Sequence, residues 1–497
     1  MKRLFCSKKI PTTSLSSHLL VSSSVQPPPH DGLYYRSSFC AALILHNSSG
    51  TTITTTNRNY FVEEKNFGTQ RIGSFKEKEL NYLINFQKRE YSTMITSDTI
   101  GTTTESATTN DTGSSIPKRP VIQIDYRNKI ILAPMVRVNG LPFRRLAARY
   151  GADIVYSEEL VDKKLLKCKP VYNEKLKTID YISEKDKSIV YQVEVVDKNS
   201  DSPTASQKVP TVLQLGTSSP EIALQVAELM IDGYDAIDVN MGCPKKFSVK
   251  GGMGSALLRP ENQENALEIL RTLVKGIQEK YGKPVTCKIR LLDTPEQTLE
   301  LFKKLQNTGV SAICVHARYI PQRPREKAHS HLIEPISKIS KVPLIANGDV
   351  FKPEDIERVK TVTGCSSVMI ARGAMWNLSI FRKGKALLDK LEVAKILLDE
   401  FITYQYPAGL SKYIIKRMFE THAKTNLYKR LIGCKGYDDL HKALHFNDGE
   451  DLNSKELSFD QITSIPEEDD LLPIIAYQST TATTTVTEPS TKKQKYQ

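Results

Sequence analysis

One short segment near the middle of the chain places a thiol directly after a predicted strand. Residues Ala236–Met241 alternate apolar side chains with Asp238 and Asn240, and the turn Gly242-Cys243-Pro244 follows at once. The alternation predicts a β-strand, which glycine and proline end. A cysteine in this position can serve as an acid or as a nucleophile, but most free cysteines are small buried side chains without a chemical role. The residues around Cys243 must decide between these two interpretations.

Seven other short apolar segments end in candidate site residues, and six of these ends carry polar side chains. Each residue alone is as well explained by structure as by function, but a lysine within a strand is costly unless it meets an anion or a polar partner. If the strands are parallel, all of these ends meet at one rim. In chain order the segments end in Ala133-Pro134-Met135-Val136, Ser157-Glu158-Glu159, Gln214, Lys288 with Arg290, His316-Ala317-Arg318, Asn347-Gly348-Asp349 and Ala371-Arg372-Gly373.

The last two of these ends have the composition of a phosphate site. Asn347-Gly348-Asp349 and Ala371-Arg372-Gly373 are glycine-containing loops, and Arg372 supplies a positive charge. Barrels often bind phosphate after strands seven and eight through backbone N–H groups. A phosphate there, with Lys288 and His316 at the mouth, is what flavin mononucleotide (FMN) requires, since a lysine near the pyrimidine edge stabilises the reduced ring.

The elements that would position these residues form a repeating strand–helix pattern. We predict an α/β fold, a (β/α)₈ TIM barrel over residues 126–385, in preference to an open doubly wound sheet, because so many different strands end in polar residues. The predicted strands are Ile130–Met135, Ala152–Ser157, Thr211–Leu215, Ala236–Met241, Val285–Ile289, Ala312–His316, Leu344–Ala346 and Ser367–Ile370. A longer insertion with alternating runs at Thr178–Ile182 and Ile189–Val196 separates the second strand from the third.

Beyond the barrel, residues 386–447 predict a small all-helical domain. Its expected helices are Lys385–Phe401, Lys412–Lys429 and Tyr437–Ala443. Lys412, Lys416 and Glu420 would share one face of the second helix, in a segment rich in basic residues. This face is a candidate nucleic-acid surface, and a simply solvated helix face explains it equally well.

Composition sets the remaining limits. The chain has 497 residues, of which 39% are hydrophobic and 25% charged, and a formal net charge of +13 that suits a polyanionic partner. Its eight cysteines show no C-x-x-C spacing, which argues against a disulfide framework or a zinc site. No apolar run near the N-terminus is long enough to span a bilayer.

The two ends of the chain have the composition of disordered extensions. Residues 1–125 and 448–497 are rich in serine, threonine and charged residues, and offer little apolar surface to offset ordering entropy. No acidic residue precedes Asp31, which is compatible with a mitochondrial transit peptide and equally with an ordinary low-complexity tail.

Seven motifs in order resemble the tRNA-dihydrouridine synthases, closest to the eukaryotic branch that acts on uridine 20 of the D-loop. The resemblance covers residues 126–445. The motifs are Ala133-Pro134-Met135, Asn240-Met241-Gly242-Cys243-Pro244, Lys250-Gly251-Gly252-Met253-Gly254, Cys287-Lys288-Ile289-Arg290, Val315-His316-Ala317-Arg318, Asn347-Gly348-Asp349 and Met375-Trp376-Asn377. The family's usual Asn-Pro after Trp376 is Asn377-Leu378 here.

The resemblance implies an FMN-containing oxidoreductase that uses NADPH to reduce the C5=C6 bond of a uracil in tRNA. Cys243 would protonate C5, and Asn240 would lie near the uracil. Arg290, Arg318, Lys412 and Lys416 are further candidates for contact with the RNA. An unperturbed thiol with a pKa of about 8.5 is largely protonated at neutral pH and can act as that acid. The residues implied to bind FMN are Pro134, Met135, Val136, Glu159, Gln214, Lys288, His316, Asn347, Gly348, Asp349, Ala371 and Arg372.

Two other functions remain open at this point. The same barrel can reduce a free pyrimidine or another small substrate, although a basic helical domain would then have no purpose. A decayed barrel can also bind RNA without catalysis, although Cys243, Lys288 and His316 are all present. We expect a monomer that binds tRNA and NADPH and no membrane. We expect it in the cytoplasm, with the nucleus and, given the basic N-terminus, mitochondria as further locations.

Overall fold

The computed structural model describes residues 122–195 and 209–452, and the backbone of four short strands between residues 44 and 71. The chain divides into two compact units, Met1–Thr112 and Gly113–Gln497, and the elements of each are described separately. The expectations for the first thirty residues and for the tail after residue 452 lie outside the described residues.

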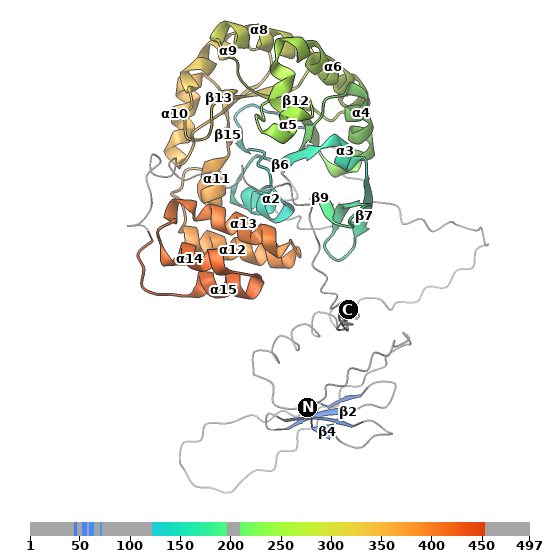
Figure 1. The fold of residues 1–497 in the computed structure, drawn as a ribbon, viewed down its shortest axis with the longest axis vertical. Coiled ribbons are helices and arrows are strands. Elements are labelled where there is room, and N and C mark those ends of the chain that lie inside the picture. Colours follow the sequence, from blue (N-terminus) through green and yellow to red (C-terminus); the bar gives the residue numbers. More distant parts are fainter. Residues whose placement is uncertain are drawn as a thin grey trace, which may run out of the picture. The chain divides into compact units, whose positions relative to one another are not determined.

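The second unit contains a closed barrel of eight parallel strands (Figure 1). Neighbouring strands follow the chain order, with β6 closing onto β10, so the (β/α)₈ prediction is confirmed and the open sheet is excluded. The strands are β5 (Ile130–Leu132), β6 (Ile154–Val161), β10 (Thr211–Gly216), β11 (Ala236–Asn240), β12 (Val285–Leu291), β13 (Ala312–Tyr319), β14 (Leu344–Asn347) and β15 (Ser367–Ile370).

Helices surround the barrel on its outer side (Figure 1). Two of them begin at side-chain caps: Thr294 caps α8 in a reciprocal capping box with Gln297, and Ser219 caps α4. The outer helices are α2 (Leu141–Tyr150), α4 (Pro220–Leu229), α6 (Gln263–Leu273), α8 (Pro295–Gln306), α9 (Glu334–Ile339) and α10 (Pro353–Thr363).

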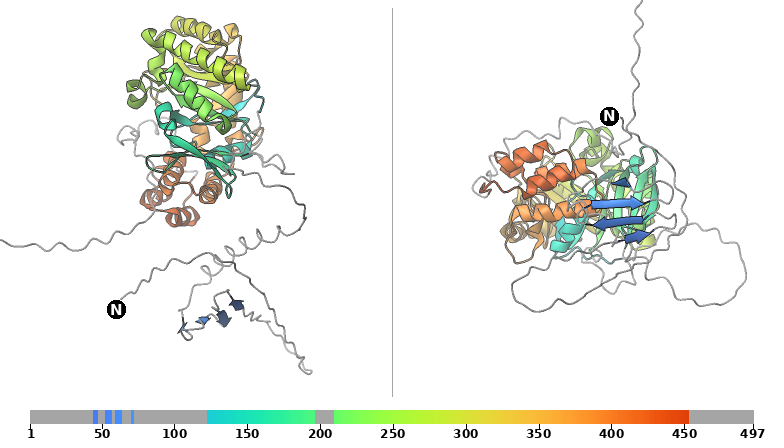
Figure 2. Two further views of the ribbon diagram at one scale, coloured as in Figure 1. Left: turned by 90° about the vertical axis from the view of Figure 1, so that its right-hand side faces the viewer. Right: turned by 90° about the horizontal axis from the view of Figure 1, so that it is seen from below.

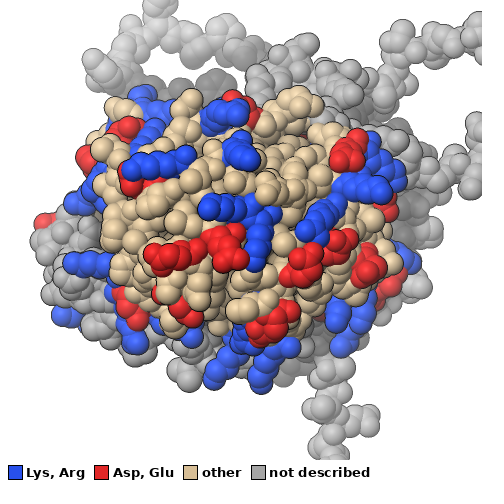
Figure 3. All heavy atoms as spheres, turned by 90° about the horizontal axis from the view of Figure 1, so that it is seen from above, with Lys and Arg blue, Asp and Glu red and all other residues tan. Residues whose placement is uncertain are grey.

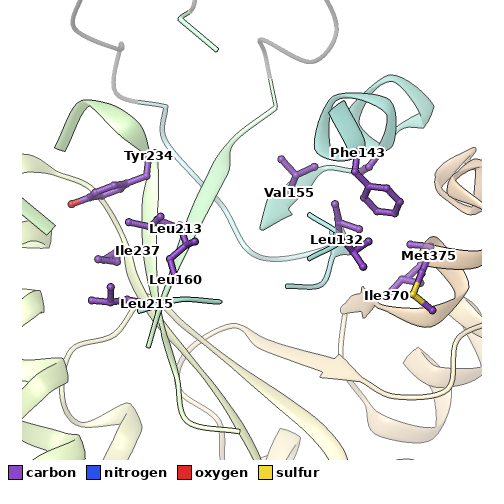
Figure 4. Packing of buried hydrophobic residues seen from close by; sticks show 14 of the residues in the cluster. Leu132, Phe143, Val155, Leu160, Leu213, Leu215, Tyr234, Ile237, Ile370 and Met375 are labelled. Atoms are coloured by element: carbon purple, nitrogen blue, oxygen red, sulfur yellow. The ribbon is translucent and has the colours of Figure 1, made fainter. Parts of the chain in front are cut away.

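Strand alternation gives the barrel two apolar cores. Side chains such as Ile131, Tyr156 and Met369 fill the interior, while Leu132, Val155 and their neighbours pack outward against the helices (Figure 4). Successive residues of a strand point to opposite sides, so both faces of a barrel strand are buried. Because both faces are buried, each barrel strand appears in the sequence as a short, continuous apolar run.

The insertion after β6 forms a separate antiparallel sheet of three strands. It consists of β7 (Cys168–Asn173), β8 (Thr178–Ser183) and β9 (Ile189–Glu194), and the short helix α3 (Asp162–Leu165) leads into it. The side view shows this sheet beside the barrel and above the C-terminal helices (Figure 2). The sequence indicated β8 and β9, but β7 contains Pro170 and alternates poorly, so it was not predicted.

The C-terminal part of the described chain is helical, as expected, but its second helix is interrupted. The predicted continuous helix Lys412–Lys429 is wrong: α13 ends at Met418 and α14 begins at Asn426. Thr425 explains the break, because its hydroxyl accepts the backbone N–H of Tyr428 and starts a new helix. The helices are α11 (Arg372–Trp376), α12 (Lys390–Thr403), α13 (Ala408–Met418), α14 (Asn426–Gly433) and α15 (Tyr437–His445).

The first unit contains an antiparallel four-stranded sheet, which lies within residues 1–125, where the composition predicted disorder. Its strands are β1 (Ile44–His46), β2 (Thr52–Thr56), β3 (Asn59–Glu63) and β4 (Gln70–Arg71). Threonine is β-branched and favours strands, so a threonine-rich run is a poor sign of disorder. Among the described helices, none combines the length and the apolar composition needed to cross a membrane.

Candidate active site

A cleft with an empty volume of about 970 Å³ opens at the carboxyl ends of the barrel strands. All but three of the sequence-predicted site residues line it, drawn from β5, β6 and β10–β15 and from the loops that follow them. The exceptions are Met135, which packs against the core, and Lys412 and Lys416 in α13. The cleft is also lined by Pro324, Val350, Phe351 and Met369, which carry no polar signal in the sequence and were not predicted.

Asn240 holds the turn that carries Cys243. Its side-chain Oδ1 accepts the backbone N–H groups of Gly242 (2.9 Å) and Cys243 (3.0 Å). The carbonyl of Cys243 in turn accepts the N–H of Ser255 (2.9 Å). The turn is therefore fixed on both sides of the thiol.

A chain of buried polar groups leads from this turn into the centre of the barrel. Asn240 Nδ2 donates to Gln214 Oε1 (3.1 Å), and Gln214 Nε2 donates to Asp238 Oδ2 (2.8 Å). Asp238 Oδ1 accepts the hydroxyl of Thr286 (2.6 Å). Because a carboxylate only accepts, Asp238 sets the orientation of both amides, and the amides set the orientation of the turn.

Asp238 is completely buried, and the loss of solvation raises its pKa to about 6. Hydrogen bonds from Thr286 and Gln214 and the charge of Lys288 oppose that shift. Asp238 is thus largely ionised at neutral pH, which agrees with its role as acceptor in the chain of amides.

The thiol of Cys243 lies beside the carboxyl group of Glu159. Burial raises the pKa of Cys243 to about 12, and the charge of Glu159 adds to the effect. Burial also raises the pKa of Glu159, which accepts a hydrogen bond from the Ser248 hydroxyl (3.3 Å). The sequence-based expectation of an ordinary thiol pKa is therefore corrected: Cys243 keeps its proton far above neutral pH.

The opposite side of the cleft is strongly basic. Arg318 Nη2 and Arg372 Nη2 both bind Asp349 Oδ1, at 2.5 and 2.7 Å. Asp349 Oδ2 also accepts the N–H of Ala328 (2.7 Å), and its backbone takes the left-handed conformation (φ 45°). One carboxylate thus orders two guanidinium groups, which leaves this side with excess positive charge.

Arg290 and Arg318 are held mainly by backbone carbonyls. Arg290 Nη1 donates to the carbonyls of Tyr319 (3.1 Å) and Gln322 (2.9 Å), and Arg318 Nε to that of Glu326 (2.7 Å). Arg318 Nη1 also lies 3.2 Å from His316 Nε2. Arginine cannot accept, so Nε2 is the acceptor and the proton of the neutral ring is on Nδ1.

Burial lowers the pKa values of both Lys288 and His316. Burial lowers the pKa of His316 well below its usual value, and Lys288, Arg290, Arg318 and Arg372 lower it further, so the ring is neutral at pH 7. Burial also lowers the pKa of Lys288. Within residues 122–195 and 209–452, the Lys288 ammonium has no hydrogen-bond partner, although it lines the cleft.

This set of donors fits FMN. The cluster around Asp349 offers positive charge where a phosphate would lie, and Lys288 is an unpaired ammonium where the ring would be. The strand register places Asn240 beside Lys288, Arg290 beside His316 and His316 beside Asn347, so these polar residues follow one another around the rim of the barrel. Buried cations without partners are costly, so an anionic ligand here is favourable.

The two lysines of α13 lie apart from this cleft. Lys412 Nζ donates to the carbonyls of Ile432 and Cys434, both at 2.7 Å, at the C-terminal end of α14. Its ammonium therefore caps a helix end. Glu420, expected on the same helix face, lies in a 3₁₀ turn after α13, where it pairs with Arg417 (3.0 Å) and accepts the indole N–H of Trp376 (2.5 Å).

Comparison with known proteins identifies similar chains. A profile of the family described as dihydrouridine synthase (Dus) matches residues 131–422. A Schizosaccharomyces pombe protein named tRNA-dihydrouridine(20) synthase [NAD(P)+] is 36% identical over 326 residues, which cover 64% of this chain and 65% of that protein. The Saccharomyces cerevisiae protein of the same name is 40% identical over 230 residues, 46% of this chain and 58% of that one.

A second S. cerevisiae protein, tRNA-dihydrouridine(20a/20b) synthase [NAD(P)+], is 32% identical over 62% of this chain and 77% of its own length. The chain thus spans less than two thirds of the length of the two relatives named for position 20.

Proposed function

Because this chain belongs to the dihydrouridine synthase family, we propose that it reduces a uridine of tRNA to 5,6-dihydrouridine, with FMN as cofactor and NADPH as reductant. We further propose position 20 of the D-loop as the target. The relatives named for position 20 share 36% and 40% identity with this chain, whereas the one named for 20a/20b shares 32%.

One observation carries the proposal: a single cleft is lined both by a thiol that keeps its proton and by the ammonium group of Lys288. Reduction of the uracil C5=C6 bond requires a hydride at C6 and a proton at C5. Cys243 is the proton donor in this arrangement, because its raised pKa keeps the proton on sulfur until the carbanion develops. FMN, when bound, supplies the hydride, and Lys288 and Arg372 would hold its ring and phosphate ends.

The other cleft residues position the reacting groups. Asn240 fixes the turn of Cys243 and leads through Gln214 to Asp238, so the backbone that carries the thiol is positioned before the base arrives. Neutral His316 and the backbone-held Arg290 line the same cleft without adding a mobile proton donor. The target base must leave the folded D-loop to reach this depth.

The test uses purified full-length protein, a D-loop-containing tRNA transcript and NADPH. We expect flavin absorbance in the purified protein, reoxidation of the reduced flavin by tRNA, and a mass gain of two hydrogens on one uridine, mapped by nuclease digestion. Free uridine is the control, and its reduction at a comparable rate would support a small-molecule reductase. A protein that binds no flavin even after FMN is added would support the non-catalytic RNA-binding alternative.

We also propose that the protein acts as a monomer in the cytoplasm or nucleus. Imaging of the full-length chain with a C-terminal fluorescent tag tests the location, and light scattering tests the oligomeric state. A mitochondrial signal would contradict the proposed location and favour the transit-peptide interpretation of the basic N-terminus.

A further inference from the structure

The inserted sheet carries a dense group of lysines at one end. Three belong to α3 and the turn after it, one to β7, and two to the turn between β8 and β9. All six side chains are exposed, and we call them the basic end of the sheet: Lys163, Lys164, Lys167, Lys169, Lys185 and Lys187.

Backbone and side-chain contacts hold these lysines together. The N–H of Glu184 donates to the carbonyl of Lys167 (2.9 Å), which joins the β8–β9 turn to the segment after α3. Lys169 Nζ pairs with Glu184 Oε1 (2.9 Å) across the same junction. The thiol of Cys168 donates to the carbonyl of Lys164 (3.4 Å). The basic end is therefore one surface, although its residues come from three parts of the sequence.

The acidic residues of the insertion mostly point away from this surface. Asp162 is buried and accepts the hydroxyl of Thr217 (2.7 Å). Asp180 is buried and accepts hydrogen bonds from Thr178 and Gln192. Only Glu184 and the half-buried Asp186 remain beside the six lysines. The sequence of the insertion is nearly balanced in charge, but folding separates the charges and leaves a positive surface.

The basic end adjoins the mouth of the cleft. Helix α3 begins at Asp162, three residues after Glu159, which lines the cleft beside Cys243. Thr217, which binds Asp162, precedes Ser218, and Ser218 lies against Gly252 in the loop after Cys243. The short helix α5 (Lys246–Lys250), between Cys243 and Gly252, adds the exposed Lys246 and Lys250. A polyanion whose base enters the cleft would thus meet further positive charge on this side.

The far side of the barrel has a different charge pattern. Over the helices at the top of Figure 1, lysine and arginine are interspersed with acidic residues (Figure 3). Ion pairs on these helices include Lys304–Glu300 (3.0 Å) on α8 and Lys338–Glu334 (2.6 Å) on α9. A simply solvated surface has such a mixture, so the basic end of the sheet is not explained by the general excess of lysine.

We propose that the basic end of the inserted sheet binds the ribose-phosphate backbone of the RNA substrate, next to the nucleotide that enters the cleft. The inference rests on the proposed function for the identity of the RNA. Exposed lysines contact phosphates without reading bases, so this surface contributes affinity and orientation rather than sequence selection.

The test compares two triple charge reversals in the full-length protein. The first is Lys163→Glu with Lys167→Glu and Lys185→Glu. The matched control reverses three exposed lysines of the outer helices and the loops beside them, Lys275→Glu, Lys303→Glu and Lys341→Glu. Both change the net charge by the same amount, so a difference between them reports on location rather than on total charge.

We expect the first variant to bind tRNA at least about tenfold more weakly at low salt, and the slope of log K against log salt to fall by about 2 for three lost phosphate contacts. The KM for tRNA should rise, whereas kcat at saturating tRNA and flavin content should stay unchanged. The control should keep most of the affinity and the slope. Equal effects of the two variants, or an unchanged slope in the first, would overturn the proposal.

Two further measurements separate the possible failures. If the glutamate variant does not fold, as judged by lost flavin, the corresponding Lys→Gln variant should still lower the slope by about 2. If the wild-type protein binds tRNA but forms no dihydrouridine, the proposed function fails while the binding comparison still decides the role of the sheet. If the wild-type protein forms dihydrouridine and the triple variant binds tRNA normally, the role of the basic end is refuted and the proposed function stands.

Discussion

Replacement of Asp238 by asparagine should stabilise the protein at neutral pH. The buried carboxyl has a pKa of about 6, whereas that of an unfolded aspartate is about 3.9. The folded state therefore holds the proton more tightly, and stability is lost as the pH rises through this range. The difference of about 2 units between the two pKa values corresponds to a loss of about 3 kcal/mol of stability at pH 7. About 1.3 kcal/mol of this loss occurs between pH 5 and pH 7.

Asparagine at position 238 can keep both hydrogen bonds. Its Oδ1 can accept from Gln214, and its Nδ2 can donate to the hydroxyl of Thr286, which is able to rotate and accept. The orientation of Gln214 and Asn240 is then preserved, so the removed charge dominates the change in stability.

The assay is urea unfolding of wild type and Asp238→Asn at pH 5, 6 and 7. We expect the variant to be more stable, and the difference between the two free energies of unfolding to increase as the pH rises. Asp186→Asn is the control, because hydrogen bonds from Ser183 and Ser188 lower the pKa of Asp186 to about 2 and its charge is constant over this range. If the stability difference between Asp238→Asn and wild type is constant with pH, or decreases toward pH 7, the raised pKa of Asp238 is wrong.

Four further predictions concern the cleft and the helices. Cys243→Ala should keep its flavin but lose most dihydrouridine formation in single-turnover assays, and unchanged turnover would end the proton-donor assignment. Iodoacetamide should alkylate Cys243 about 10³-fold more slowly at pH 8 than it alkylates a free thiol, since a pKa of about 12 leaves little thiolate. Mass spectrometry measures the alkylation rate as a function of pH, and a rate that levels off near pH 9 would contradict the raised pKa. Lys288→Met should weaken FMN binding by about tenfold or more in equilibrium dialysis, because it removes a charged donor, and retention of wild-type affinity would contradict the role given to this ammonium. Lys412→Ala should lower thermal stability by removing the cap of α14, whereas Lys416→Glu should reduce the slope of log K against log salt for tRNA binding by about 1. If Lys412→Ala weakened tRNA binding and Lys416→Glu lowered stability, these separate roles would be wrong.

The barrel and most of the cleft could be predicted from sequence because both depend on local signals. Each parallel strand is a short apolar run, and the polar residue that ends it must lie at the common rim. Cys243, Lys288 and His316 were found in this way, each from the end of a different strand. The residues that were missed, such as Phe351 and Met369, are apolar and look the same as core residues in a sequence.

Other properties depend on contacts that only the fold creates. The cap formed by Lys412 needs two carbonyls from residues twenty or more positions away, so the sequence alone indicated only a basic helix face. The high pKa of Cys243 depends on its burial and on Glu159, which lies in another strand. The break between α13 and α14 depends on Thr425, whose capping role is hidden in a run of residues that otherwise favour a helix.

Arg145 in α2 joins two elements that flank the barrel. Its guanidinium pairs with Glu194 at the end of β9 and with Glu400 in α12 (3.1 Å), and the hydroxyl of Tyr404 donates to Glu194 (3.3 Å). These contacts are largely removed from solvent, with about a tenth of each of the three charged side chains exposed. These contacts therefore hold the inserted sheet and the C-terminal helices at a defined spacing. For the RNA substrate proposed above, this spacing predicts that binding depends on the folded dimensions of the RNA as well as on its charge.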